Sequence, residues 1–491
     1  MKYVFLAAFC LLLLLSGAVY LRTDAAHGGA PVLYWTTDPN PARVEQVRLF
    51  RKWLADTGHA DIELRLDTAN SDPSKKIIQG VSGVAGDLLD LGPTDLPFFV
   101  STGLLADVTD AARSNGFSPA DTFATVRPLI EQNGRQYRYP CNVSVQLMWA
   151  NKTTLAKYGQ PLPPAVWDME TFERLGRAFV AAAAKPGERQ MVFYADGLDR
   201  VTLRRGLGLD TYNETLTRCT LDDARYVRVL EKLRQWTFVD RLLPNAADVE
   251  GFATGGGYAG VGPQLFNNGN YALLLMGRHA LIQLRAFGPM DLVVLELPTT
   301  GFRNAVVTVR GTGVYAGSKH RREAELFLQF LASQPYNEQI TADADALPPN
   351  PAFAQGEAFT DPPGRPSERG VHAPFADAAK AIGVPPSVCP FVLPGVADRI
   401  DLNAYDGFML SGRLTAAAAA KQAAVRINAE IERNVGERPE LRADYEKRLT
   451  QQKQIDALRS AGKQVPLAWI DNPFHRAYYR AQGWADEGMG R

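Results

Sequence analysis

Cysteine is scarce in this chain of 491 residues, which contains four. Cys10, Cys141, Cys219 and Cys389 are too scattered to match a disulfide framework or a zinc site. If Cys10 leaves with a cleaved leader, an odd number remains, so at most one intramolecular disulfide can form. We expect the three remaining side chains to be small buried thiols, although the sequence leaves a disulfide among them open. We expect no bound metal.

Net charge and catalytic motifs are missing as well. The formal net charge is +0, so there is no basic field to hold nucleic acid. No Gly-x-Ser-x-Gly, His-Glu-x-x-His, Walker A or Cys-x-x-Cys pattern occurs. The three glycines at 255–257 follow no predicted strand, which favours a flexible loop over a phosphate cradle. The residues therefore indicate no enzyme, no cofactor and no nucleic-acid partner.

A long uncharged stretch lies near the N-terminus. It spans residues 3–21 and follows Lys2, which is typical of a secretory signal or a membrane anchor. Cleavage near Val19 or Ala26 is one interpretation, and an uncleaved anchor is the other. In either case we expect residues 1–26 to target the protein, and the folded part to lie in the periplasm or outside the cell.

The rest of the chain is long enough for two or more domains. Short apolar stretches at 31–37, 62–66 and 86–92 alternate with helical patterns, which indicates a parallel α/β sheet. Asp168 is placed to cap a helix that follows it. Residues 350–394 are rich in proline and glycine and predict a long surface connection.

One predicted strand in mid-chain carries an unusual polar face. Asn142, Ser144 and Gln146 alternate with apolar residues, and this period of two predicts a strand with one buried face and one accessible face. Amide and hydroxyl groups both donate and accept hydrogen bonds. The polar face therefore suits either a ligand or ordinary hydrogen bonds to nearby backbone.

Several longer stretches resemble one protein family when they are taken in chain order. They are "PVLYWTTD", "GVAGDLLDLGPTDLPFFVSTGLLADVTD", "GRQYRYPCNVSVQLMWANKTTLAKYGQPLPPAVWDMETF", "NNGNYALLLMGRHAL" and "RGTGVYAGSKHRREAELFLQFLAS". Together they resemble the extracellular solute-binding proteins of ABC transporters (family 1), in the branch that binds sugars and oligosaccharides. The resemblance covers residues 31–436.

This resemblance implies an α/β fold of the periplasmic-binding-protein type II. Two lobes would be joined by crossing hinge strands, and each would be built from discontinuous chain. We expect lobe 1 to contain residues 31–142 and 304–372, and lobe 2 to contain residues 143–303 and 373–436. Residues 437–491 would form a helical C-terminal extension, which either packs on the body or docks another envelope protein.

The resemblance also implies a ligand site in the cleft between the lobes. Its candidate residues lie at strand ends, on the crossing strand and in a glycine-rich stretch expected to be a loop: Trp35, Thr37, Asp38, Thr94, Asp95, Asn142, Ser144, His279, Arg310, Gly311 and Thr312. Each has a structural alternative. Trp35 could stack on a sugar ring or pack in the core, and Asp38 could bind ligand or cap a helix.

The sequence departs from the family at His279, where many members have a tryptophan after Gly-x. This change removes one expected platform for stacking on a sugar, and it leaves room for an anionic or modified sugar held by Arg278 or Arg310. The resemblance implies a monomeric binding protein that delivers a sugar, oligosaccharide or sugar acid to an ABC permease. The alternative is a membrane-anchored ligand sensor or scaffold with the same fold.

Overall fold

The computed structural model describes residues 11, 12, 14, 15, 17, 30–252 and 260–488. Most of the predicted leader, and all three glycines at 255–257, lie outside the described residues. Within the described part of the chain, no helix has the length and apolar character needed to cross a membrane.

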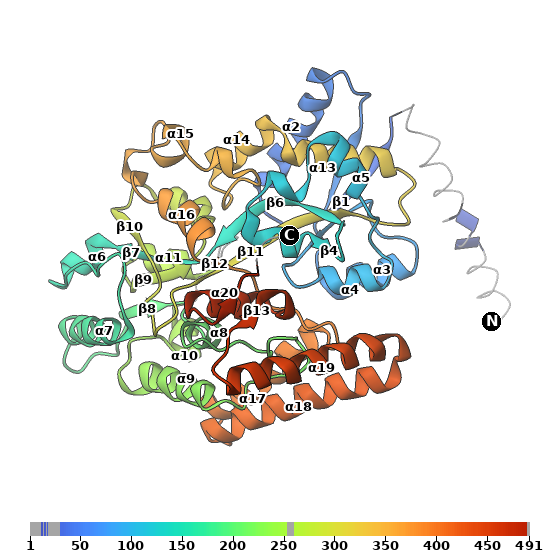
Figure 1. The fold of residues 1–491 in the computed structure, drawn as a ribbon. Helices are drawn as coiled ribbons and strands as arrows, with labels where there is room; N and C mark the ends of the chain where they lie inside the picture. The colour runs from blue at the N-terminus through green and yellow to red at the C-terminus, as the bar shows by residue number, and fades with distance from the viewer. Residues whose placement is uncertain (1–10, 13, 16, 18–29, 253–259, 489–491) are drawn as a thin grey trace, which may run out of the picture.

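Two β-sheets form the frame of the two lobes (Figure 1). The larger sheet has the order β12-β11-β3-β1-β2, with β6 paired to β11. Its strands are β1 (Val32–Thr36), β2 (Glu63–Asp67), β3 (Leu88–Leu91), β6 (Arg138–Val145), β11 (Ala305–Val314) and β12 (Gly383–Val384). β1 runs parallel to β2 and β3, which confirms the pattern predicted for the N-terminal strands, whereas β11 runs antiparallel to β3 and β6.

Helices pack around this sheet to bury its apolar residues. They are α2 (Ala42–Asp56), α3 (Pro73–Val81), α4 (Leu96–Ser101), α5 (Thr109–Asn115), α13 (Arg321–Ala332) and α14 (Gln334–Asp343), and a short pair of strands, β4 (Glu131–Gln132) and β5 (Arg135–Gln136), lies beside them. The core contains Trp35, Phe50 and Phe327, and the ring centroids of Trp35 and Phe327 are 4.8 Å apart. α2 begins after Asn40, whose side chain accepts a hydrogen bond from the Ala42 backbone N–H.

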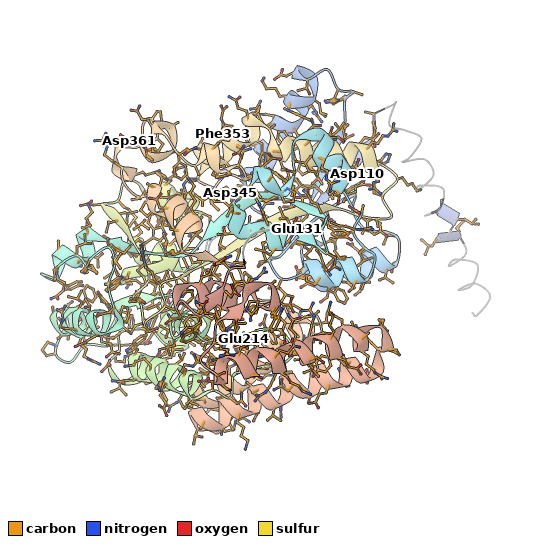
Figure 2. The ribbon with its side chains drawn as sticks, in the orientation of Figure 1. Asp110, Glu131, Glu214, Asp345, Phe353 and Asp361 are labelled. Carbon is orange, nitrogen blue, oxygen red and sulfur yellow. The ribbon has the colours of Figure 1, made fainter. Side chains whose placement is uncertain are left out.

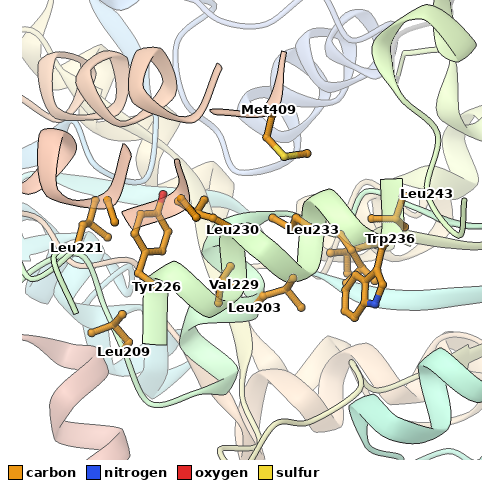
Figure 3. Packing of buried hydrophobic residues seen from close by; sticks show 14 of the residues in the cluster. Leu203, Leu209, Leu221, Tyr226, Val229, Leu230, Leu233, Trp236, Leu243 and Met409 are labelled. Carbon is orange, nitrogen blue, oxygen red and sulfur yellow. The ribbon is translucent and has the colours of Figure 1, made fainter. Parts of the chain in front are cut away.

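The second sheet has the order β10-β7-β9-β8. Its strands are β7 (Leu147–Asn151), β8 (Phe193–Asp196), β9 (Tyr271–Met276) and β10 (Leu292–Leu295), and its helices are α6 (Lys152–Lys157), α7 (Met169–Ala183), α8 (Arg200–Gly206), α9 (Ala224–Arg234), α10 (Ala246–Gly251), α11 (Gly262–Asn267) and α12 (Ala280–Leu284). The Asp168 side chain accepts from the Thr171 N–H at 2.8 Å, which confirms the predicted cap of α7. Figure 3 shows α9 presenting Tyr226, Val229, Leu230 and Leu233 to the core of this lobe.

The C-terminal third of the chain is mostly helical. It contains α15 (Glu357–Thr360), α16 (Ala373–Ala381), α17 (Pro394–Met409), α18 (Ala416–Glu437), α19 (Pro439–Ser460) and α20 (Pro473–Ala481), with the strand pair β13 (Val465–Pro466) and β14 (Ala485–Asp486). The long helices α18 and α19 lie side by side (Figure 1). The expectation of a long surface connection at 350–394 was wrong, because α16 and β12 lie in this segment and Phe375 of α16 is fully buried.

Several segments, called passages below, connect the part of the chain around the larger sheet with the part around the second sheet. β6 leads to β7 through Gln146, and β10 leads to β11 through residues 296–304. α16 contacts β6, β11 and β12 of the larger sheet, and residues 385–393 then lead to α17, which packs on α18. The exact lobe boundaries stay predictions.

The three cysteines that the structure describes, Cys141, Cys219 and Cys389, are free and buried. This confirms the expectation of buried thiols. Burial raises the pKa of each thiol to about 12, so all three are protonated at neutral pH.

Candidate functional site

A polar cleft of about 380 Å³ opens where the larger sheet meets the turn after β9. Residues from both sides line it: Asp38, Ser71, Lys76, Asp90, Leu91, Gly92, Pro93, Asn142, Ser144, Gln146, His279, Thr308, Val309, Arg310, Asp345 and Ala346. Its volume lies within the range of about 300–1,000 Å³ that is usual for small-molecule sites. The cleft is therefore large enough for a small solute.

The polar side chains of β6, together with Gln146 directly after it, form one wall of this cleft. Asn142, Ser144 and Gln146 line it, while Val143 and Val145 point into the core and are at most 1% exposed. β6 has this geometry because it pairs with β11 along most of its length, including Ser144 opposite Thr308. The side chains offered to the cleft both donate and accept hydrogen bonds.

Asp90, which was not among the predicted site residues, organises the charged wall of the cleft. Its carboxylate accepts hydrogen bonds from Trp35 Nε1 at 2.7 Å, from Thr37 Oγ1 at 2.5 Å, from Thr312 Oγ1 and from Arg310 Nη1. Although burial by itself raises the pKa of Asp90, the Arg310 charge and the three donors lower it overall. An acidic residue inside the apolar stretch "LLDLG" was the sequence signal for this buried site.

Two further carboxylates, Asp38 and Asp345, are joined by arginines. Arg43 Nε lies 2.8 Å from Asp38 Oδ1, and Arg43 Nη1 lies 2.6 Å from Asp345 Oδ2. Arg310 completes the cluster, with Nε 3.8 Å from Asp38 and Nη2 3.9 Å from Asp345. Burial raises the pKa of Asp38, but Arg310 and Arg43 lower it well below its usual range. Arg43 and Asp345 were not among the predicted site residues, because nothing in their local sequence marks them.

The charges of this wall balance. The acidic groups are Asp38, Asp90 and Asp345, and the basic groups are Arg43, Arg310 and Lys76. Lys76 Nζ donates to the backbone oxygen of Asp90, and burial lowers its pKa. With Lys76 protonated, the six groups carry no net charge. A neutral ligand can therefore enter without leaving a buried charge uncompensated.

His279 faces this wall from the turn between β9 and α12. Burial lowers its pKa from the ordinary value, so the imidazole is neutral at pH 7 and has one donor and one acceptor nitrogen. It approaches Ser144 over Gly277, where a Cβ atom would lie 2.7 Å from both His279 Nδ1 and Ser144 Oγ. Glycine at this position thus permits the contact between the turn and β6.

Trp35 does not occupy the position expected of a sugar-stacking residue. It is fully buried, it packs on Phe327, and its indole N–H is bonded to Asp90. The Arg310 guanidinium lies 5.8 Å from its ring centroid. In this structure the ring therefore belongs to the core, which matches the structural alternative.

The other candidates separate into two groups. Thr37 and Thr312 are fully buried and donate hydrogen bonds to Asp90. They therefore hold the Asp90 carboxylate from the core side of the wall. Thr94 and Asp95 are not among the lining residues of the cleft; they follow Pro93, which does line it, and Asp95 Oδ2 accepts from the Gly92 N–H at 2.8 Å.

Two expectations about arginine positions need correction. Arg310 and Gly311 belong to the strand β11 and not to a glycine-rich loop, with a bulge between them where the pairing with β6 shifts. Arg278 is buried outside the cleft, where it donates to His372 Nδ1 at 2.9 Å and to the Ala346 and Thr341 carbonyl oxygens at 2.7 Å. These bonds hold its guanidinium in the core, and Arg278 does not line the cleft.

A family model for bacterial extracellular solute-binding proteins matches residues 54–367. The chain belongs to this family. No curated protein matches its sequence. The assignment confirms the resemblance seen in the sequence, and it places the protein in a class of binding proteins that act outside the cytoplasm.

Solved structures with the same fold come from several bacteria. An ABC substrate-binding protein from Listeria monocytogenes in complex with cycloalternan is 20% identical with a TM-score of 0.68, over 82% of this chain and 99% of that one. The GacH receptor of Streptomyces glaucescens, solved unliganded and with acarbose, is 16% identical with a TM-score of 0.65, over 82% and 99%. UgpB from Mycobacterium tuberculosis in complex with glycerophosphocholine is 17% identical with a TM-score of 0.64, over 83% and 100%.

These similarities confirm the two-lobe α/β fold of this solute-binding protein. They also show a difference in length, because the neighbours are covered almost completely while about a fifth of this chain lies outside each match. The protein therefore carries segments beyond the shared fold.

Proposed function

We propose that this protein captures a carbohydrate-type solute in the polar cleft and delivers it to an ABC permease in the membrane. The observation that carries the proposal is the cleft itself, in which hydroxyl, amide and carboxylate groups of the larger sheet face His279 across the opening. A sugar hydroxyl donates and accepts hydrogen bonds, and such groups can satisfy both roles. Two neighbours, in complexes with cycloalternan and acarbose, support a sugar as the ligand class.

Direct contacts to the solute are proposed for Asp38, Asn142, Ser144, His279 and Arg310. Asp38 is the acidic member of the wall with the most exposed side chain, at 26%, and its oxygens are suited to accept from sugar hydroxyls. Thr37, Gly311 and Thr312 position these groups, and Thr94 with Asp95 shapes the rim. The core position of Trp35 leaves it out of this set.

Binding would close the two lobes over the solute by a hinge motion. A ligand drives closure only if it binds the closed form more tightly than the open form. Contacts from both sides of the cleft would provide this difference, because a solute that touches both His279 and the charged wall gains contact as the lobes approach. The proposed hinges are the crossing strands near residues 142–145 and 304–307.

A thermal-shift screen of the purified protein tests the proposed ligand class. The screen uses neutral oligosaccharides, sugar acids, polyols and glycerophosphodiesters. A ligand at 100 times its Kd stabilises the native state by about 2.7 kcal/mol, which gives a clear rise in Tm. We expect a neutral carbohydrate to raise Tm, and Asn142→Ala with Ser144→Ala to remove the rise. Ser114→Ala, on α5 outside the cleft, is the matched control.

Delivery to a permease needs a separate measurement in cells. Deleting the gene should abolish uptake of the radiolabelled solute, and restoring the intact chain should recover it. Normal uptake with a lost transcriptional or behavioural response would contradict transport and favour the anchored sensor. A screen in which no carbohydrate raises Tm, or in which the cleft variants respond like the wild type, would contradict the proposed site.

A further inference from the structure

The C-terminal extension places one aromatic side chain against two of the passages between the lobes. Phe474, on α20, forms a buried apolar cluster with Phe302 and Val384. Its ring centroid lies 5.5 Å from that of Phe302 in an edge-on arrangement, and Tyr478 on the same helix lies 5.2 Å from Phe302. Phe302 lies in the passage from β10 to β11, and Val384 ends β12 directly before the passage to α17.

A buried arginine extends the same contact to the backbone. The Arg205 guanidinium lies 4.7 Å from the Phe474 ring centroid. Its Nη2 donates to the carbonyl oxygens of Val384 at 2.9 Å and Pro385 at 3.3 Å. Because the ring covers the guanidinium, Phe474 also fixes the group that holds the start of the passage at residues 385–393.

α20 is itself fastened to the second lobe. Asn472 Nδ2 donates to Asp210 Oδ2 at 2.9 Å and to the Tyr212 carbonyl oxygen at 3.0 Å. The Tyr479 hydroxyl donates to Glu214 at 2.6 Å. Figure 2 shows Glu214 between α19 and α20. These bonds attach α20 to lobe 2, which also contains Arg205. The aromatic side chains of α20 therefore contact the two passages from the side of lobe 2.

The fit between α20 and the lobe leaves little space. Gly208, at φ +72°, lies so close to Tyr478 that a Cβ atom there would overlap the ring. The β10–β11 passage is also held by the bond from the Phe302 N–H to the Gly206 carbonyl oxygen at 2.9 Å. Phe302, in this passage, therefore packs between the end of α8 and the aromatic side chains of α20.

We propose that α20 is a hinge brace, which restricts the opening motion of the two lobes by holding both passages against lobe 2. Hinge motions are absorbed by a few connecting residues whose backbone angles change. Packing and hydrogen bonds on residues 302–304 and 384–385 restrict those changes, so the ligand-free protein samples a narrower range of openings. The proposal depends on the two-lobe fold and not on the identity of the solute.

Spin-label distance measurements on the ligand-free, full-length protein test this brace. The labels are placed at Ser82→Cys after α3 and Ala181→Cys on α7, both exposed, in a Cys10→Ser background. We expect Phe474→Leu to widen the distance distribution between the lobes. In parallel, amide hydrogen exchange of residues 298–304 and 383–392 should become about tenfold faster, as a loss of local protection predicts.

Phe408→Leu is the matched control, since Phe408 is also buried and also lies against an arginine, Arg234, but on α17 away from the passages. Tyr478→Leu is a second, milder variant that tests the same contact if Phe474→Leu does not fold. The brace is overturned if a folded Phe474→Leu or Tyr478→Leu protein keeps the wild-type distribution, or if Phe408→Leu widens it equally. Neither result bears on whether a sugar binds, so failure here is distinct from failure of the proposed function.

Discussion

A single buried carboxylate, Asp90, shows how the cleft wall is built at the scale of residues. Its oxygens bind donors from β1, from β11 and from the residue that follows β1. A buried charge without partners would be costly, and the convergence of these groups on Asp90 offsets that cost. The result is an Arg310 side chain held in place beside the proposed solute. Asp38 has the most exposed side chain of the three carboxylates in the wall, so a substitution there tests solute binding most directly.

Asp38→Asn should raise the Kd for the identified solute about tenfold or more. The amide keeps the shape of the side chain but loses the charge, and a hydrogen bond to a charged group is worth about 1.5–3 kcal/mol. Titration calorimetry measures the affinity, and urea unfolding of the same variant separates binding from stability. Glu45→Gln, which removes one surface ion pair with Arg48, is the control. Equal affinity in wild type and Asp38→Asn would place the solute elsewhere.

The buried ion pair around Glu368 predicts a specific loss of stability in acid. Burial by itself raises the pKa of Glu368, but the bidentate bond from Arg285 and the contact with His372 lower it to about 2. An unfolded glutamate has a pKa of about 4.3. Because the folded value is lower, the stabilisation is fully present above about pH 4.3 and is lost as the pH falls toward 2.

Glu368→Gln should therefore reduce the free energy of unfolding at pH 7 by roughly 1–3 kcal/mol, and it should flatten the decline of that free energy between about pH 4.3 and 2. Urea unfolding at pH 7, 5, 4 and 3 measures both effects. A variant that declines as steeply as the wild type would show that Glu368 does not contribute this term.

At the scale of elements, α18 illustrates how a helix is docked by one polar side chain. Its apolar face, which includes Ala420, Ala424, Ile427 and Ile431, is buried in the core of the second lobe. In the middle of this face Asn428 pairs with the backbone of Cys219. Its Oδ1 accepts from the Cys219 N–H at 2.7 Å, and its Nδ2 donates to the Cys219 carbonyl oxygen at 3.2 Å.

Asn428→Ala should lower the free energy of unfolding by about 1–3 kcal/mol, because it leaves two backbone groups without their partner. Chemical denaturation monitored by tryptophan fluorescence measures the change. Asn115→Ala, at the exposed end of α5, should stay near the wild type. A loss no greater than that of this control would mean that the apolar face alone docks the helix.

At the scale of the whole molecule, the extension after α18 is joined to the body through buried charge. Glu214 is 4% exposed, and its side chain binds Gln452 and Arg459 at 2.9 Å and Tyr479 at 2.6 Å. All three partners belong to the extension. Its helices therefore complete the hydrogen bonding of lobe 2 in addition to lying on its surface.

Deleting residues 438–491 should destabilise the protein by about 3–5 kcal/mol or more, because it removes the buried Phe474 ring from its cluster with Phe302 and Val384, together with the partners of Glu214. Glu214→Gln should be destabilising in the full chain, where the carboxylate is buried and paired, and close to neutral in the shortened chain, where water can hydrate it. Thermal and urea unfolding of the four proteins forms a double-mutant cycle. If Glu214→Gln changes stability equally in both backgrounds, the carboxylate is not what couples the extension to the body.

The local sequence pattern by itself was enough to predict a strand with a polar face, the start of a helix and the protein family. The period-two alternation around Ser144 defines a strand with a polar face, and Asp168 marks the start of α7, because both signals depend on neighbours in the chain. The order of the matched stretches indicated the two-lobe fold and the solute-binding family, which the family match confirms. The assignment of ligand contacts to the polar strand stays a prediction.

Only the tertiary structure decided how the charged wall is assembled and which candidates are buried. Arg43 and Asp345 are 302 positions apart in the chain, and Arg310 and Asp90 are 220 apart. Their pairing depends on the contact of α2 with α14 and on the register of β11 against β3, which local pattern does not specify. The same packing directs Trp35 into the core and Arg278 toward backbone carbonyl oxygens. These side-chain directions are set by the neighbouring elements in the fold and not by the local sequence.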